Sequence, residues 1–409
     1  MQIRFLVGLY YAHGETILNE RMQSMKYQFT LKEGILLHHT KSISLGLCLL
    51  LTLSACGSTA ASSSAPTSTP AVSAESAAEP TTTSSVAADA EFSTDLFAMD
   101  TYMTMKAYGP GAQSALSDIS SMISDLDSRL SVTNMESEIY QLNHAEGKSV
   151  PLSDATADLL SKALALGGTT GGALELTSYP LSLAWGFTTG DYQIPDQEAI
   201  DGLLPLVDDS AITLEGGSAI LPTDAQLDLG AVAKGYAGDR AAEILQDAGV
   251  TSALLNLGSS TIRAIGSKPD GSPWRIALQD PNDTSAYAGV VSATDLAIDT
   301  SGGYERYFEG DDGEVYWHIL DPDTGYPAKN GLISVTVLSD SALTGDGLST
   351  ALFVMGLSDA IDYWRENGGF EFIFITDQNE IYVSQGAQDL FQPLGSYETA
   401  EIHVVTEAS

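Results

Sequence analysis

Residues 57–90 are the stretch that most restricts how this chain can fold. They read GSTAASSSAPTSTPAVSAESAAEPTTTSSVAADA, which is serine, threonine, alanine and proline with almost no large apolar side chain. Such a segment cannot bury enough apolar surface to offset the entropy of ordering it, so we interpret it as a disordered linker. As a random coil of about 35 residues it spans on the order of 30–35 Å. A folded domain therefore has to come from the residues after this linker, and we predict that it covers residues 92–405.

The segment before the linker is typical of an export signal. Residues 42–55 read SISLGLCLLLTLSA, and Lys41 stands just before them. The apolar run from 43 to 53 is too short to cross a bilayer as a stable helix. A basic residue followed by a short apolar run is the layout of a signal peptide. We therefore predict that residues 1–55 are a signal peptide region.

Cys56 follows Leu-Ser-Ala, and small residues before a cysteine resemble the lipobox of bacterial lipoproteins. In such proteins the cysteine carries a diacylglycerol and becomes the new N-terminus. Residues 56–91 would then be a lipidated cysteine plus linker, and the protein would be anchored on the extracytoplasmic face of the cell membrane. The alternative is a buried helix with an incidental cysteine, but the linker after Cys56 cannot belong to a core. The stretch before Met25 is unusual for a signal peptide, so a further hypothesis is that translation starts at Met25.

Charge and cysteine content restrict the chemistry of the domain. The 409 residues carry 54 acidic and 17 basic side chains, for a formal charge of −37. An acidic surface repels phosphate backbones, so nucleic acid is not expected as a partner. The same acidity suits a protein that uses a divalent cation to handle an anionic ligand. Because Cys48 and Cys56 are the two cysteines, the domain has no internal disulfide, no thiolate nucleophile and no cysteine-bound zinc.

Hydrophobic periodicity predicts an α+β domain. Apolar and polar residues alternate over 92–108, as in a strand or hairpin, and a helical stripe follows over 114–130. Short strands interleaved with helices argue for one large mixed domain. Further predicted elements are a helix over 154–166 with Asp154 as N-cap, helical turns near 196–207, a strand, turn and helix over 226–250, strands around 253–338, helices over 346–355 and 358–366, and strands over 370–384.

Four segments are richer in Gly, Asp, Thr and His than a core needs. The segment from Leu227 to Tyr236 ends a predicted strand with glycines and puts Lys234 at the start of a helix, which makes an anion site. Asp228 in the same segment is able to accept hydrogen bonds from a ring edge. The segment from Thr300 to Arg306 has the hydroxyls and glycines to wrap a phosphate or sugar. The alternative for the first segment is a plain turn with a surface lysine. The alternative for the second segment is a simple ion pair of Arg306.

The other two segments carry a histidine and a carboxylate. His318 leads into the Asp-Pro-Asp-Thr-Gly turn, where a purely structural histidine is the alternative to a catalytic one. Asp346 and Thr350 are four residues apart, so on a helix their oxygens lie on one side. A carboxylate, a hydroxyl and backbone carbonyls are ligands suited to Mg²⁺. The alternative is that Asp346 only caps the helix.

Taken in order, these segments resemble the FAD:protein FMN transferase family, also called the ApbE family. The resemblance covers residues 92 to about 395 and implies a single ApbE-type, T-fold-like domain. Each motif is weak alone, and the set is specific because all occur in family order. They are FAMDTYMT, SRLSVTNMESEIYQLN, GALELTSYPLSLAWGF, LDLGAVAKGYAGDRA with NLG behind it, TSGGYERYF with HILDPDTGYP, and LTGDGLSTALFVMG.

The resemblance also implies an activity and site residues. The family transfers FMN from FAD to a Ser or Thr hydroxyl of a target protein, needs Mg²⁺ and releases AMP. Metal positions match Asp346, Thr350 and the carbonyl of Ala231, with Ser349 where some members have a metal-binding Asp. Flavin-contacting positions match Met99, Thr177, Ser178, Tyr179, Asp228, Lys234 and Ile319. Arg306 is added because it is one of few arginines in an acidic chain. His318 matches a position of the family motif. From the chemistry of the side chains, the expected catalytic groups are His318 or Asp321 as acceptor of the hydroxyl proton and Lys234 as positive charge near the phosphates.

Two rival functions stay open from the sequence. Water in place of the acceptor hydroxyl would make the protein a FAD pyrophosphatase that yields FMN and AMP. A non-catalytic flavin-binding lipoprotein is the second rival, although mere storage needs no metal pair such as Asp346 and Thr350. Family resemblance suggests acceptors among membrane redox complexes or extracytosolic FMN-binding domains.

Overall fold

A nine-stranded sheet forms the centre of the computed structural model, which describes residues 86–407. Cys56, the signal peptide region, Met25 and most of the linker lie outside the described residues. The sheet order is β1-β2-β6-β7-β10-β13-β14-β15-β17, and neighbours are antiparallel except the parallel pair β15–β17. The strands are β1 (Glu91–Ala98), β2 (Thr101–Tyr108), β6 (Ala253–Leu257), β7 (Thr261–Ile265), β10 (Ala297–Gly302), β13 (Leu332–Ser339), β14 (Glu371–Thr376), β15 (Ile381–Ser384) and β17 (Ile402–Val405).

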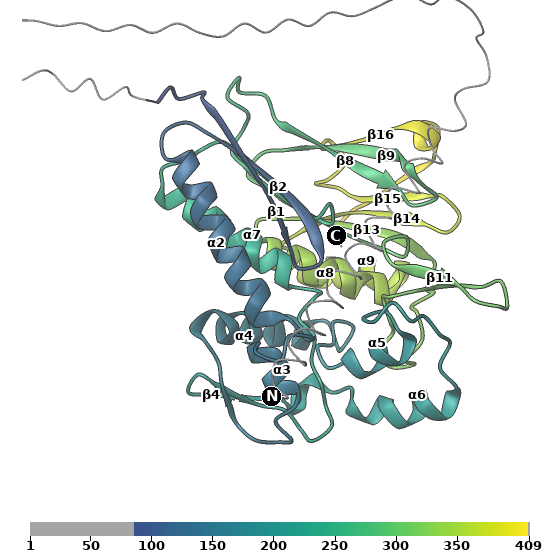
Figure 1. Cartoon of the computed structure of the whole chain (residues 1–409). Coiled ribbons are helices and arrows are strands. Elements are labelled where there is room, and N and C mark those ends of the chain that lie inside the picture. The colour runs from purple at the N-terminus through teal and green to yellow at the C-terminus, as the bar shows by residue number, and fades with distance from the viewer. Residues whose placement is uncertain (1–85, 408–409) are drawn as a thin grey trace, which may run out of the picture. The chain divides into compact units, whose positions relative to one another are not determined.

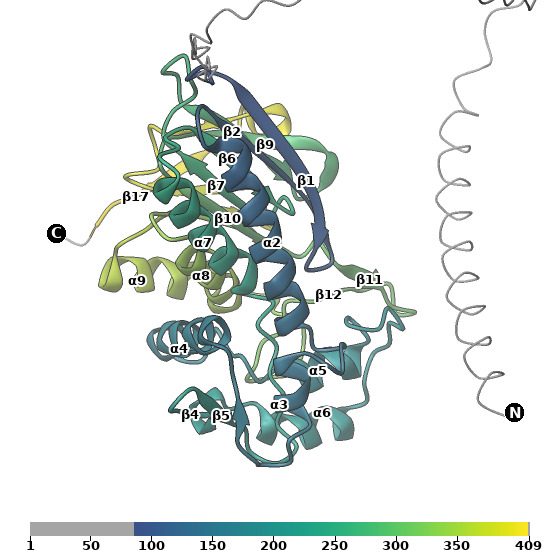
Figure 2. The same ribbon diagram turned by 60° about the vertical axis from the view of Figure 1, so that its left-hand side comes forward.

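The two faces of this sheet pack against different layers, because successive side chains of a strand point to opposite sides. In β14, Phe372 and Phe374 join the core under the helices, whereas Ile373 and Ile375 join the core under a second sheet. The helical layer, seen in Figure 1 and Figure 2, consists of α2 (Ala112–Leu130), α7 (Ala233–Asp247), α8 (Ala342–Met355) and α9 (Leu357–Asn367). The second sheet contains β8 (Trp274–Asp280), β9 (Asp283–Ala293) and β16 (Phe391–Pro393).

A group of short elements lies beyond one end of the helical layer (Figure 1). It is formed largely by the segment between α2 and α7, so the chain leaves the main sheet after α2 and returns through α7. Its members are α3 (Glu138–Asn143), β3 (Val150–Pro151), α4 (Asp154–Thr169), α5 (Tyr179–Trp185), α6 (Gln197–Leu203), η1 (Leu204–Leu206), η2 (Asp209–Ala211), β4 (Thr213–Glu215) and β5 (Ser218–Ile220). The hairpin of β11 (Tyr307–Glu309) and β12 (Val315–Trp317) and the short helix η3 (Gly395–Tyr397) complete the fold.

Most predicted elements are present. The alternating segment forms the β1–β2 hairpin, closed by Met99 and Asp100 with φ of 50° and 58°. Positive φ at both central residues is the geometry of a tight hairpin turn. Within residues 86–407 no helix combines the length and apolarity that a membrane span requires.

Three local predictions were wrong. The N-cap of α4 is Ser153, whose hydroxyl accepts the N–H of Thr156, and Asp154 is the first helical residue. Asp346 does not cap α8, because the helix begins at Ala342 with Ser341 as its cap. The predicted strand at 226–230 is an extended segment instead.

The side-chain amide of Asn143 explains why this segment forms no ladder. Its Nδ2 donates to the Leu227 carbonyl at 2.9 Å, and its Oδ1 accepts the Leu227 N–H at 2.8 Å. The next N–H, of Asp228, donates to the Leu176 carbonyl. These bonds supply the partners that a neighbouring strand would otherwise provide.

Candidate functional site

Asp346 is the centre of a buried polar site between α7 and α8. It lies one turn into α8, and the residue is 6% exposed. Its Oδ2 accepts the N–H of Gly235 at 2.9 Å, and its Oδ1 lies 3.7 Å from the Lys234 Nζ. Burial raises the pKa of Asp346, whereas Lys234 and the Gly235 N–H favour the charged form. The site thus holds a carboxylate with incomplete charge compensation.

Two glycines allow the elements around Asp346 to approach so closely. A Cβ on Gly235 would overlap the carbonyl of Ala342 at the start of α8. A Cβ on Gly345 would overlap the carboxylate of Asp299 in β10. These glycines therefore bring α7 and β10 against α8, so that their polar groups meet at Asp346.

The carbonyl of Ala231 is left available by the same arrangement. In a regular helix the Gly235 N–H would bond to the carbonyl four residues earlier, which is that of Ala231. Here that N–H donates to Asp346, and within residues 86–407 no other hydrogen bond to the Ala231 carbonyl is formed. A free carbonyl beside a buried carboxylate is what a cation site requires.

A row of hydroxyls continues from Asp346 along α8. The Ser349 Oγ donates to the Asp346 carbonyl at 2.8 Å, so the Ser349 oxygen can accept from Ser301, which is also 2.8 Å away. Thr350 Oγ1 lies 3.2 Å from the same Ser301 hydroxyl. The structure thus places Ser349 and Thr350 beside β10, with Ser301 as their shared partner.

Asp299 is a second carboxylate at this site, and the sequence reasoning missed it. It lies in β10 and is 0% exposed. Burial and the charge of Asp346 raise the pKa of Asp299 well above its usual value. Thr261 in β7 is the nearby hydroxyl, and its bond, at 3.4 Å, is to Asp346. The available signal was an acidic residue that follows the apolar run Leu-Ala-Ile and stands directly before Thr300.

This donor set fits a hard divalent cation. The donor atoms are mostly oxygens, which come from two carboxyl groups, several hydroxyls and a free backbone carbonyl. Oxygen is the ligand atom that Mg²⁺ prefers. Two buried carboxylates would carry two negative charges, of which Lys234 offsets one. The assignments of Asp346, Thr350, Ser349 and the Ala231 carbonyl as metal ligands agree with this arrangement and stay predictions.

A second polar group surrounds Asp228 at the entry to α7. The Gly230 N–H donates to Asp228 Oδ1 at 2.8 Å. Burial raises the pKa of Asp228, and the charges of Arg306 and Lys234 oppose this. These three predicted residues are therefore close enough to act on one another electrostatically.

The stretch from Thr177 to Tyr179 lies next to Asp228. The Thr177 hydroxyl is fully used, since it donates to Glu175 at 2.5 Å and accepts the Asp208 N–H at 2.8 Å. Ser178 is at the N-cap position of α5, and Tyr179 is buried with a raised pKa, caused first by burial and then by Asp228. The Thr177 N–H also donates to Glu175, at 2.8 Å, so a backbone contact of Thr177 with a ligand would use its carbonyl.

His318 follows β12 and faces the Arg306 backbone. Its Nδ1 lies 3.3 Å from the Arg306 carbonyl, which can only accept, so Nδ1 carries the proton, and Nε2 has no hydrogen-bond partner within residues 86–407. Burial, followed by the charge of Arg306, lowers the pKa of His318 to about 4. The imidazole is therefore neutral at pH 7, which is the form that accepts a proton.

The two residues after His318 that were singled out have structural contacts. Ile319 is buried, and its carbonyl accepts the Ala328 N–H. The Asp321 carboxylate accepts the Asp323 N–H at 2.9 Å and so stabilises the turn before Gly325. A catalytic role for Asp321 stays a prediction.

Met99 lies apart from these groups in the β1–β2 turn. Its N–H donates to Asp127 of α2 at 2.8 Å. Within the described residues no hydrogen bond joins Met99 to the other predicted site residues, so its flavin contact stays a prediction.

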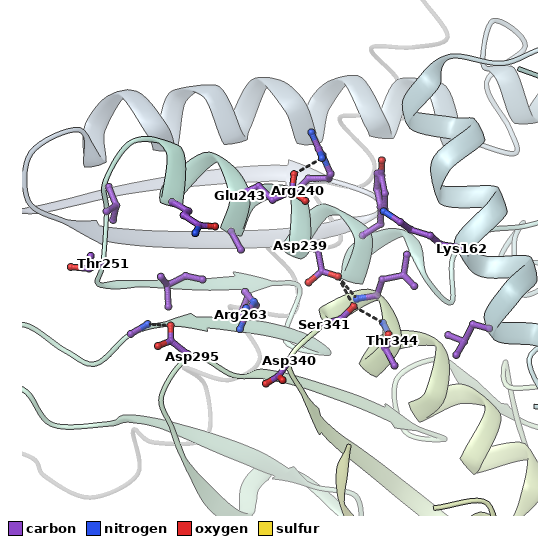
Figure 3. Close-up of a pocket in the computed structure, with 18 of the residues that line it drawn as sticks. Lys162, Asp239, Arg240, Glu243, Thr251, Arg263, Asp295, Asp340, Ser341 and Thr344 are labelled. Carbon is purple, nitrogen blue, oxygen red and sulfur yellow. Dashed lines mark hydrogen bonds and ion pairs between the residues drawn. The ribbon is translucent and has the colours of Figure 1, made fainter. Parts of the chain in front are cut away.

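A cavity of about 1100 Å³ lies on the other side of α7 (Figure 3). None of the predicted site residues lines it. At its edge Asp239 of α7 accepts hydrogen bonds from the Ser341 hydroxyl and the N–H groups of Ala342 and Leu343, and so caps α8. The cavity wall thus fixes the start of the helix that carries Asp346.

Fold and site together define a mixed α+β enzyme domain whose oxygen-rich centre lies where two helices cross. Residues 99–374 match the model of the ApbE family. The chain belongs to the ApbE family.

Curated relatives and solved structures agree with this family. A FAD:protein FMN transferase of Vibrio cholerae is 36% identical over 245 residues, covering 58% of this chain and 72% of that protein. A FAD:protein FMN transferase of Klebsiella pneumoniae is 32% identical over 310 residues, covering 75% of this chain and 95% of that protein. The ApbE protein of Thermotoga maritima has a TM-score of 0.69 at 29% identity, covering 74% of this chain and 99% of that one. The Pseudomonas stutzeri flavinyl transferase ApbE has a TM-score of 0.67 at 30% identity, covering 74% of this chain and 97% of that one.

Proposed function

We propose that this protein transfers FMN from FAD to a Ser or Thr hydroxyl of a target protein and releases AMP. The observation that carries this proposal is the oxygen-lined centre around Asp346, in a chain whose relatives are named FAD:protein FMN transferases. An acidic protein of charge −37 needs local positive charge to hold a pyrophosphate. Lys234 supplies one such charge directly beside the site.

The reaction replaces the phosphoanhydride bond between the two halves of FAD with a phosphoester bond to the acceptor. The acceptor hydroxyl oxygen bonds to the FMN phosphorus, the bond from that phosphorus to the bridging oxygen breaks, and AMP leaves with the bonding electron pair. The hydroxyl proton passes to a base, for which the free Nε2 of His318 is the candidate. Lys234 at the start of α7 would stabilise charge on the phosphates.

Mg²⁺ is the proposed cofactor. Bound by Asp346, Thr350 and the Ala231 carbonyl, it would neutralise the pyrophosphate and the charge that develops on AMP. Asp228 and the stretch from Thr177 to Tyr179 would then contact the flavin nucleotide, because they lie together at the entry to α7.

The experiment incubates the protein with FAD, Mg²⁺ and a peptide carrying the acceptor hydroxyl, followed by mass spectrometry. A covalent FMN–peptide adduct together with AMP is expected. Free FMN and AMP without adduct would instead indicate a FAD pyrophosphatase. Bound FAD without any AMP would indicate a flavin-binding protein.

The variant Asp346→Asn tests the centre itself. Asparagine keeps an oxygen for the Gly235 N–H but removes the charge, so AMP release should fall about 100-fold or more. The exposed neighbour of α8, Asp340, provides the matched control Asp340→Asn, which should retain activity. Wild-type turnover by D346N would contradict the assignment of Asp346.

Location and acceptor are part of the same proposal. A lipid on Cys56 would tether the enzyme on the extracytoplasmic face of the cell membrane, within reach of acceptors in membrane redox complexes or extracytosolic FMN-binding domains. Metabolic labelling with palmitate, compared between the wild type and Cys56→Ala, tests this part. Equal labelling of both would refute the anchor.

A further inference from the structure

Asp299 is the buried charged group that the proposed reaction has not used. Its side chain is completely buried, and within residues 86–407 neither carboxylate oxygen has a hydrogen-bond partner. A buried carboxylate without donors is costly, and native structures rarely keep one without a compensating group. Within residues 86–407 the Asp299 carboxyl therefore has two ways to avoid this cost, which are to keep its proton or to bind a cation.

The surroundings of Asp299 show what kind of partner it needs. A Cβ on Gly345 would overlap Asp299 Oδ2, so the carboxylate lies directly against α8, one residue before Asp346. The same Cβ position is 3.1 Å from the Ser339 hydroxyl, but that hydroxyl donates to the Ser341 carbonyl at 2.6 Å. Thr261 has one hydrogen to donate, lies 3.4 Å from Asp346 and lowers the pKa of both carboxyl groups, so it cannot satisfy both of them. The neighbouring hydroxyls are thus too few for both carboxyl groups.

Lys234 does not supply the missing partner of Asp299 either. Its Nζ is 3.7 Å from Asp346 and 3.5 Å from the Gly230 carbonyl, and within the described part of the chain it forms no ion pair with Asp299. The Lys234 ammonium group thus pairs with Asp346 and leaves Asp299 without an ion-pair partner among the described residues. An ionised Asp299 would therefore require a positive charge that binds oxygen ligands, and a hard divalent cation has this property.

We propose that Asp299 is a second carboxylate ligand of the divalent cation held by Asp346. This inference deepens the proposed function and rests on it for the presence of a cation. The cation would then lie where β10, α7 and α8 meet. Asp299 would thereby raise cation affinity and keep the cation bound while FAD and AMP exchange.

The test measures Mn²⁺ binding by electron paramagnetic resonance on the full chain, without FAD. The variants are Asp299→Asn, which keeps the volume and removes the charge, and Asp340→Asn as the exposed control beside α8. D299N should weaken Mn²⁺ binding by about tenfold or more. D340N should bind like the wild type.

Thermal unfolding provides a second readout that separates binding from misfolding. Without metal, D299N should melt at a temperature equal to or above the wild type, because the acidic group that is buried against Asp346 is gone. Added Mn²⁺ should raise the melting temperature of the wild type clearly and that of D299N much less. If D299N does not fold, Asp299→Ser offers a smaller neutral side chain for the same comparison.

Two results would overturn the proposal. One is wild-type Mn²⁺ affinity in D299N or D299S, which would make Asp299 a protonated structural group. The other is the absence of Mn²⁺ binding by the wild type at millimolar concentration. Failure of the proposed function looks different: Mn²⁺ would bind in an Asp299-dependent way, but no AMP would be released from FAD.

Discussion

At the scale of single residues, the site depends on groups that burial keeps in an unusual state. His318 stays neutral because it is partly buried and lies near Arg306, and its Nδ1 is occupied by a backbone carbonyl. A pKa of about 4 makes the imidazole a weaker base than a free histidine. Its value as a proton acceptor would therefore come from position, with Nε2 as the only free nitrogen of the ring.

The depressed pKa of His318 predicts a pH dependence of stability. In the unfolded chain this histidine takes up a proton near pH 6.5, whereas in the fold it resists until about pH 4. The wild type should therefore lose stability relative to His318→Gln as the pH falls from about 6.5 to about 4, by about 1–3 kcal/mol. Urea unfolding across this range measures it.

The control for this prediction is the exposed His144, which stacks on Tyr140. His144→Gln should follow the wild-type curve. Parallel curves for the wild type and H318Q would show that His318 titrates alike in the folded and unfolded chain.

At the scale of elements, the crossing of α7 and α8 sets the geometry of the site. Gly235 faces the Ala342 carbonyl with no room for a Cβ, whereas a Cβ on Gly238 would lie 3.1 Å from the Ala342 side chain. Both glycines are inside α7. Replacing either by alanine gives the same gain in helix propensity, about 1 kcal/mol.

Gly235→Ala should therefore destabilise the protein by about 1–3 kcal/mol more than Gly238→Ala, because it pushes α7 away from α8. It should also weaken Mn²⁺ binding, since the Gly235 N–H orients Asp346. Chemical unfolding and Mn²⁺ titration of the two variants check both effects. Equal stability of G235A and G238A would mean that the helices shift without cost.

Elements were predicted correctly from the sequence where the spacing of apolar residues follows the buried face of a helix or strand. The stripe over 114–130 became α2, and the alternating segment over 92–108 became the β1–β2 hairpin. Prediction failed at 226–230 because Asn143, 84 residues away, bonds to both backbone groups of Leu227. A contact so distant in sequence leaves no local signal.

The same limit applies to the site. Asp346, Lys234 and Thr350 stood in motifs and were identified from them. Asp299 was missed because its position near Asp346 depends on β10 lying against α8, which follows from sheet register and from the missing side chain of Gly345. Neither is visible in the run of residues around Asp299.

At the scale of the whole molecule, net charge opposes the substrate. The chain carries −37, and FAD brings a pyrophosphate of the same sign. Lys234 and Arg306 act over a short range near Asp228, whereas the acidic surface acts at longer range and is screened by salt. Approach of FAD and its final binding should therefore respond differently to ionic strength.

Raising KCl from about 20 mM to about 200 mM at constant, saturating Mg²⁺ should speed the association of FAD about two- to threefold. Stopped-flow quenching of flavin fluorescence measures the rate. NaCl in place of KCl should give the same effect. A slower association at high salt would show that the field of Lys234 and Arg306 extends beyond the site and dominates the encounter.

The sheet order has a practical consequence for engineering. β1 and β17, the first and last strands described, form opposite edges of the nine-stranded sheet. With strands about 4.8 Å apart, the two edges are separated by roughly 38 Å. A circular permutant would thus need a connecting loop of at least about 12 residues. New termini are better placed in the surface turn at Gly271, where an added side chain would meet no neighbouring atom.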